Sequence, residues 1–187
     1  MAFTLGDSPI HPFTVDDVMQ MLEAGIIPED NQFELLHGLL TEKAVRSPAH
    51  CELKTRLAEW LGTSEAYRVR VEGALRVADD TSLPEPDVAV VQRAYRLEMH
   101  PAGALLVIEV AKTSLKTDTE IMPPLYAGAD IPECWVIDVE AGRVRAFRDP
   151  TPDGYATYTT HGPTGTLAPL AVDVEPLDLA GLFVGLR

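Results

Sequence analysis

The sequence contains little cysteine and no long hydrophobic run. Cys51 and Cys134 are its two cysteines, they lie far apart, and neither belongs to a CxxC or Cys/His pattern. We therefore expect free thiols rather than a disulfide or a zinc site. No hydrophobic stretch approaches the roughly 20 residues that cross a bilayer, and the amino-terminal residues lack the basic-then-apolar layout of a signal peptide. We expect a soluble, cytoplasmic protein that does not associate with membranes.

Basic residues are also scarce. The chain has 15 lysines and arginines against 29 acidic residues, which gives a net charge of −14. This balance argues against tight non-specific binding to nucleic acid, which needs a basic face. It does not exclude a metal-dependent site that neutralises its own carboxylates. Arg68 and Arg70 fall on one face of an expected strand, and we favour a solvated sheet face over a phosphate track there.

The 187 residues, 46% of them hydrophobic, are enough for one globular domain spanning residues 1–187. A first helix is expected after Thr14, which can cap its start, and should end at Gly25. A second should begin at Ser47 and Pro48 and end at Gly62. Between the two helices, "FELLHGLLTEKAV" favours a hairpin or a bulged strand.

The rest of the chain is expected to be mostly β-structure. Strands are predicted at 67–72, 75–77, 87–92, 104–110, 133–139, 144–148, 155–160 and 170–174, with a short helical or irregular piece before 126 and a terminal helical turn at 177–183. Two early helices followed by a β-rich part with one inserted helix predict an α+β, or mixed α/β, fold.

Two acidic residues lie in apolar surroundings. Asp87 leads directly into the aliphatic run "VAVV", and Glu109 lies near the end of the next strand. Acids at the same end of two neighbouring strands can bind a divalent cation, which prefers hard oxygen ligands. Glu34, in "FELLHG", is a third acid in apolar company and would complete a set of three oxygen donors. Alternatively, each acid makes only a salt bridge or caps a turn.

Five segments in this order resemble a large bacterial family, mostly uncharacterised and formerly catalogued as a domain of unknown function. It belongs to the restriction-endonuclease-like, PD-(D/E)xK superfamily. The resemblance covers roughly residues 13–148, and the segments that carry it are "FELLHGLL", "SPAH", "PEPDVAVV", "LLVIEVAKTSLKTD" and "LYAGADIPECWVID".

The resemblance implies a central mixed β-sheet flanked by helices, with metal-binding acids on the two central strands. Asp87 matches the aspartate of the PD motif, Glu109 the second acid, and Glu34 the upstream glutamate. In active relatives these acids, with the backbone carbonyl of the residue after the second acid (here Val110), hold Mg²⁺ or Mn²⁺. His50 recurs at this helix start in the family, and we favour a capping or packing role for it over contact with the site.

The sequence departs from the family pattern where a lysine is expected. Ala111 stands two residues after Glu109, and the alternative family position, four residues before Tyr126, is Met122. Lys112 and Lys116 are nearby substitutes. Lys112 is the lysine that we name for catalysis, but it reaches the site only if the strand bends or bulges there. Alternatively it is a solvated lysine at the strand end, and we favour this alternative.

The downstream helix is also expected to be disturbed. Pro123 and Pro124 fit a helix only in its first turn, because neither donates a backbone hydrogen bond. The missing lysine and the disturbed helix thus fall together.

These features leave two main hypotheses. The first is a Mg²⁺-dependent or Mn²⁺-dependent endonuclease that hydrolyses phosphodiester bonds of nucleic acid, most plausibly DNA, through Asp87, Glu109, Glu34 and Lys112. The second is a catalytically inactive nuclease fold that acts as a binding or assembly module, with a homodimer as one form of it, because Met122 replaces the family lysine. A third, weaker hypothesis is a cleft for a small molecule that carries phosphate.

Overall fold

The centre of the fold is a mixed β-sheet of six strands in the order β10-β9-β8-β7-β6-β5. The computed structural model describes residues 4–5, 7–28, 33–43, 46–77, 80–94, 99–112 and 114–186. β7 and β8 pair in parallel, and all other neighbours in the sheet are antiparallel. The strands are β5 (Tyr67–Val71), β6 (Val88–Gln92), β7 (Leu106–Ala111), β8 (Glu133–Asp138), β9 (Arg143–Thr151) and β10 (Gly154–His161).

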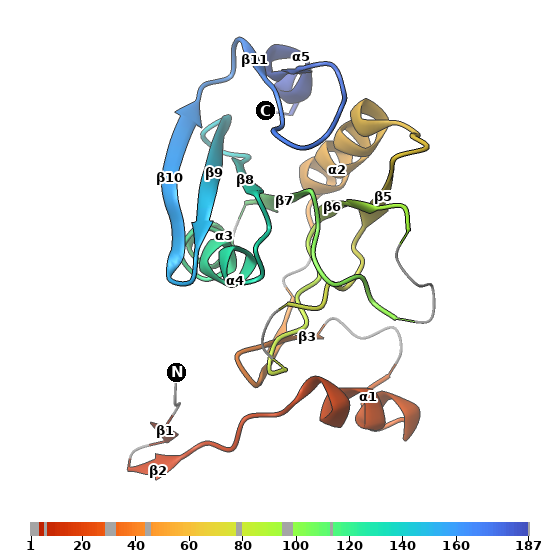
Figure 1. Cartoon of the computed structure of the whole chain (residues 1–187). Helices are drawn as coiled ribbons and strands as arrows, with labels where there is room; N and C mark the ends of the chain where they lie inside the picture. The colour runs from red at the N-terminus through yellow and green to blue at the C-terminus, as the bar shows by residue number, and fades with distance from the viewer. Residues whose placement is uncertain are drawn as a thin grey trace.

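Helices cover both faces of this sheet (Figure 1). On one side lie α2 (Pro48–Leu61) and α5 (Leu179–Phe183). On the other lie α3 (Leu115–Glu120) and α4 (Met122–Gly128). The expected mixed architecture, a central sheet flanked by helices, is therefore confirmed.

Alternation along the central strands divides the core into two halves. Val88 and Ile108 face α2, and they pack with its Leu53 and Leu57. The residues between them along the strands face the other way, where Ala89 and Val107 belong to the half that packs against α4. Because β7 is buried on both faces, a charged residue on it needs a specific partner.

The remaining elements surround the sheet. A hairpin of β3 (Phe33–Leu36) and β4 (Leu39–Glu42) lies between the sheet and α1 (Val15–Glu23), which is at the bottom of Figure 1. The short pairs β1 (Thr4–Leu5) with β2 (Ser8–Pro9), and β11 (Thr166–Leu167) with β12 (Leu177–Asp178), complete the described strands.

Local signals in the sequence explain several element ends. Thr14 and Asp17 form a reciprocal capping box at the start of α1, and the Ser47 hydroxyl accepts the backbone N–H of His50 at the start of α2. The β3–β4 hairpin turns at His37 and Gly38, which have φ of 51° and 81°. Positive φ at both central residues is what a tight two-residue hairpin turn requires.

Two predicted strands are wrong. In the segment 75–77, the Leu75 N–H donates to the carbonyl of Pro84 and the Arg76 N–H to that of Pro101, and the segment forms only a single β-bridge. A proline has no N–H to return, so a ladder cannot continue there. The segment 170–174 consists of bends and irregular backbone instead of a strand, and the backbone N–H of Leu170 donates to the carboxylate of Glu133.

Two other expectations concern the thiols and the membrane. Cys51 is exposed and Cys134 is buried, and both are free thiols, as predicted. Within the part of the chain that the structure describes, no helix combines the length and the apolar character that crossing a membrane requires.

Candidate functional site

The sheet register brings Asp87 and Glu109 together. Val88 on β6 pairs with Ile108 on antiparallel β7, so the start of one strand lies beside the end of the other. The Asp87 N–H donates to Oε2 of Glu109 at 3.3 Å, and the Val110 N–H donates to Oδ2 of Asp87 at 2.8 Å. Both side chains are buried. The two acids that were predicted from separate strands therefore form one pair.

Both acids of this pair line a pocket with a volume of about 630 Å³. The pocket lies between the β3–β4 hairpin, the start of α2, the end of β7 and the start of α4. The residues predicted for the site that line it are Glu34, Asp87, Glu109 and Lys112. Met122, where the resemblance places a lysine, lines it as well.

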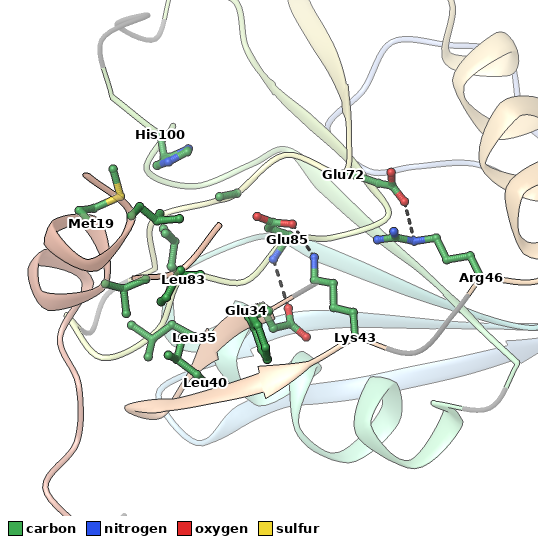
Figure 2. A pocket seen from close by; sticks show the side chains of 15 residues that line it. Met19, Glu34, Leu35, Leu40, Lys43, Arg46, Glu72, Leu83, Glu85 and His100 are labelled. Carbon is green, nitrogen blue, oxygen red and sulfur yellow. Dashed lines mark hydrogen bonds and ion pairs between the residues drawn. The ribbon is translucent and has the colours of Figure 1, made fainter. Parts of the chain in front are cut away.

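Glu34 enters the pocket from β3. The backbone N–H of Glu85 donates to its Oε2 at 3.4 Å, and Lys43 forms an ion pair with the Glu85 side chain at 2.5 Å (Figure 2). Burial raises the pKa of the Glu34 carboxyl, and the nearby Lys43 opposes this rise. The burial of Glu34 at the wall of the pocket therefore disfavours the ionised form of its carboxyl group.

Glu109 is the most deeply buried acid of the site. Its burial raises its pKa well above the ordinary value, and the charges of Asp87 and Asp118 raise it further. The Tyr126 hydroxyl donates to Oε1 of Glu109 at 2.5 Å, which favours the ionised form. Tyr126 is fully buried, as expected of a core residue, and in addition it orients this acid.

Asp118, on α3, is an acid that sequence reasoning did not assign to the site. It lines the pocket and is 9% exposed. Burial raises its pKa to about 6, the hydrogen bond from the Ser114 hydroxyl opposes that rise, and the charges of Asp87 and Glu34 add to it. The feature of the sequence that could have indicated this contact is the spacing of Ser114 and Asp118, which lie about one helical turn apart.

Two basic side chains from α2 contact Asp87. The His50 Nε2 lies 2.7 Å from Oδ1 of Asp87, and the Lys54 Nζ lies 3.9 Å from the same oxygen. The backbone N–H of His50 donates to the Ser47 hydroxyl at the helix cap, but the side chain contacts Asp87 and lines the pocket, so the favoured capping or packing role of this side chain is wrong. Lys54 was missed. Its signal was the spacing His50–Lys54, which places both residues on one helix face.

The chain bends where Lys112 needs it to bend. β7 ends at Ala111, and Lys112 follows in a bend, exposed and at the edge of the pocket. Lys116 is exposed on α3 and does not line this pocket. Lys112 is therefore the better placed of the two lysines that were considered as substitutes.

The region around Met122 matches the expectation from its prolines. α3 ends before Ile121, and α4 begins at Met122, so Pro123 and Pro124 lie in the first turn of α4. Met122 is 3% exposed. A buried thioether thus occupies the wall where the family lysine is expected.

The donor set fits a hard divalent cation. Asp87, Glu109, Glu34 and Asp118 supply carboxylate oxygens to one pocket, and these are the ligands that Mg²⁺ and Mn²⁺ prefer. Three of the four have raised pKa values, to which the charges of the other acids contribute, and a cation would relieve that repulsion. Among the described residues, no three His, Cys, Asp or Glu side chains converge closely enough to hold a metal ion as they stand.

Comparisons with known proteins identify the family of the chain and a solved structure of similar fold. No curated protein matches the chain. A solved structure, described as that of a "putative nuclease belonging to DUF820" from Anabaena variabilis ATCC 29413, is similar in fold, with a TM-score of 0.75 and 16% sequence identity. The match covers 94% of this chain and 100% of that one. The family model of Uma2, described as "Putative restriction endonuclease", matches residues 15–180. The resemblance drawn from the five sequence segments is confirmed, and the chain belongs to the Uma2 family.

Proposed function

We propose that this protein hydrolyses phosphodiester bonds of DNA with Mg²⁺ or Mn²⁺ as its cofactor. The observation that carries the proposal is the buried Asp87–Glu109 pair at the floor of a pocket that is open to solvent. Membership of the Uma2 family supports a nuclease, and the acidic pocket supports a divalent cation. The chain has a net charge of −14, which repels nucleic acid. A nuclease activity therefore requires that the cation screen the substrate phosphate from these acids.

The residues that would hold the cation are Asp87, Glu109, the backbone carbonyl of Val110, and Glu34. When bound there, a divalent cation lowers the pKa of a water molecule and offsets negative charge on the leaving oxygen. Tyr126 keeps Glu109 oriented through its hydroxyl, and the Val110 N–H does the same for Asp87. The protein would thus supply oxygen donors rather than a nucleophile of its own, and the hydrogen bonds from Tyr126 and Val110 hold two of these donors.

The amine of this site is assigned to Lys112. It is exposed at the edge of the pocket, where an ammonium group can orient the attacking water and stabilise negative charge on the phosphate. Lys43 and Arg46 also line the pocket, but each is already paired with a carboxylate, Lys43 with Glu85 and Arg46 with Glu72. Lys112 is therefore the lysine of the pocket lining that we propose for contact with the phosphate.

The test is cleavage of supercoiled and linear DNA with Mg²⁺, with Mn²⁺ and with EDTA. We expect nicked or linear products only with a divalent cation, and none from Glu109→Ala. Glu120→Gln, which removes an exposed carboxylate from α3, is the control and should cleave like the wild type. Equal cleavage by wild type and Glu109→Ala would end the proposal.

A second candidate function is a catalytically inactive binding or assembly module. Buried Met122 in the pocket wall favours it, because the family lysine is absent there. Met122→Lys separates the two candidates. Metal-dependent cleavage gained by this variant, with none in the wild type, would show an intact scaffold that lost only its lysine. Robust cleavage by the wild type would end this second reading.

A further inference from the structure

A buried lysine on α2, Lys54, lies beside Asp87 of the acidic pair. Lys54 is 6% exposed and lies on the face of α2 that meets the sheet, next to Leu53 and one turn before Leu57. Lysine is almost never buried to this degree unless its ammonium group is paired. The chain has only four lysines, and three of them, Lys43, Lys54 and Lys112, lie at or beside the candidate site.

The ammonium group of Lys54 joins two carboxylates. It forms an ion pair with Glu72, and its Nζ lies 3.9 Å from Oδ1 of Asp87. Arg46 pairs with the same Glu72 oxygen as Lys54 does, and its Nε lies 2.6 Å from that oxygen (Figure 2). Glu72 itself has φ of 52°, a conformation that a residue other than glycine adopts uncommonly.

The same network fixes Asp87 at three points. The Glu72 N–H donates to the backbone carbonyl of Asp87 at 3.2 Å. Oδ1 of the side chain is held by His50 and Lys54, and Oδ2 by the Val110 N–H. A carboxylate offers about four lone-pair directions. Asp87 therefore keeps about one lone-pair direction, on Oδ2, for a ligand while its rotation is restricted.

We propose that Lys54 is a positioning residue, which holds the Asp87 carboxylate in the orientation that binds the divalent cation. The inference rests on the function proposed above. Lys54 does not line the pocket, so it acts through Asp87 and not on the substrate. A role in stability alone explains it poorly, because replacing a buried ion pair by apolar residues of the same volume is often neutral or stabilising.

The test measures Mn²⁺ binding by isothermal titration calorimetry in the wild type and in Lys54→Met. Loss of a residue that supports a metal ligand typically weakens metal binding by about 10-fold to 100-fold. We expect Lys54→Met to bind Mn²⁺ about tenfold more weakly, and to cleave DNA correspondingly more slowly. Lys116→Met, which removes an exposed lysine from α3, should bind like the wild type.

The Asp87→Asn background separates positioning from a structural role. If Lys54 acts through the Asp87 carboxylate, Lys54→Met should change Mn²⁺ affinity little once that carboxylate is gone. An equal loss in both backgrounds would overturn the inference. Tighter Mn²⁺ binding by Lys54→Met would also overturn it, because Lys54 would then compete with the cation. If Lys54→Met fails to fold, Glu72→Gln, which releases Lys54 from its other partner, should weaken Mn²⁺ binding several-fold, and unchanged binding would refute the proposal.

The two proposals fail in different ways. If the wild type binds Mn²⁺ and cleaves no DNA, the proposed hydrolysis is refuted, and the affinities alone decide the role of Lys54. If the wild type binds no Mn²⁺, both proposals fall.

Discussion

Replacement of Asp118 by asparagine should stabilise the protein at neutral pH. Burial raises the pKa of Asp118 from 3.8 to about 6, so the folded protein keeps this proton over a pH range in which the unfolded chain has lost it. Because the folded pKa is raised, the associated stability is present below pH 3.8 and is lost as the pH rises through about 6. A rise of about two pH units corresponds to about 3 kcal/mol at about 1.4 kcal/mol per unit.

Asparagine imitates the protonated side chain, and its oxygen can still accept the hydrogen bond from the Ser114 hydroxyl. The advantage of Asp118→Asn over the wild type should therefore grow with pH, from about 1.5 kcal/mol at pH 5 to about 3 kcal/mol at pH 7.5. The low exposure of Asp118, 9%, leaves little solvent to screen this effect.

The assay is urea denaturation in EDTA at pH 5, 6 and 7.5, with the free energy of unfolding extrapolated to water. Asp153→Asn is the control, because it removes an exposed carboxylate and changes the net charge equally. It should show no such growth with pH. A difference between wild type and Asp118→Asn that stays constant over this range would refute the claim that the pocket desolvates Asp118.

Three further predictions follow from single contacts. Tyr126→Phe removes the hydroxyl that donates to Glu109, so it should lower the free energy of unfolding by about 1.5–3 kcal/mol if Glu109 is ionised, as measured by urea denaturation at pH 8; an unchanged stability would contradict that contact. Glu133→Gln breaks the pair between a fully buried carboxylate and Arg148, and should cost about 3–5 kcal/mol in the same assay while DNA cleavage per folded molecule stays at the wild-type level; a small cost would mean that this pair is not desolvated. Addition of Mn²⁺ at 100 times its dissociation constant should stabilise the wild type by about 2.7 kcal/mol and leave Asp87→Asn nearly unchanged; equal stabilisation of both would place the cation elsewhere.

Patterns within single elements predicted most of the fold. The capping residues Thr14 and Ser47 marked the starts of α1 and α2, and aliphatic runs marked β6, β7 and β8. The failures were segments whose backbone bonds depend on distant partners. The segment 75–77, which places Arg76 between two aliphatic residues, satisfies strand propensity, but its backbone N–H groups donate to the carbonyls of prolines. Propensity cannot anticipate which segment the fold places alongside.

The part of the site that lies on or next to the buried strands could be predicted from the sequence. Asp87 and Glu109 stood out because a charge in a buried strand needs a reason. Lys54 and Asp118 did not stand out, because a lysine or an aspartate on a helix is ordinary until the burial of that helix face is known. The bend that brings Lys112 to the pocket depends on where β7 ends, and strand ends are weakly encoded in local sequence.

The central claim is that Asp87 and Glu109 together hold a divalent cation. Its most direct test is isothermal titration calorimetry of Mn²⁺ binding to the wild type and to Glu109→Gln, at pH 7.5 and in the absence of DNA. The account predicts one saturable site in the wild type and its loss, or a decrease in affinity of at least about tenfold, in the variant. Equal Mn²⁺ affinity in the two proteins would contradict it.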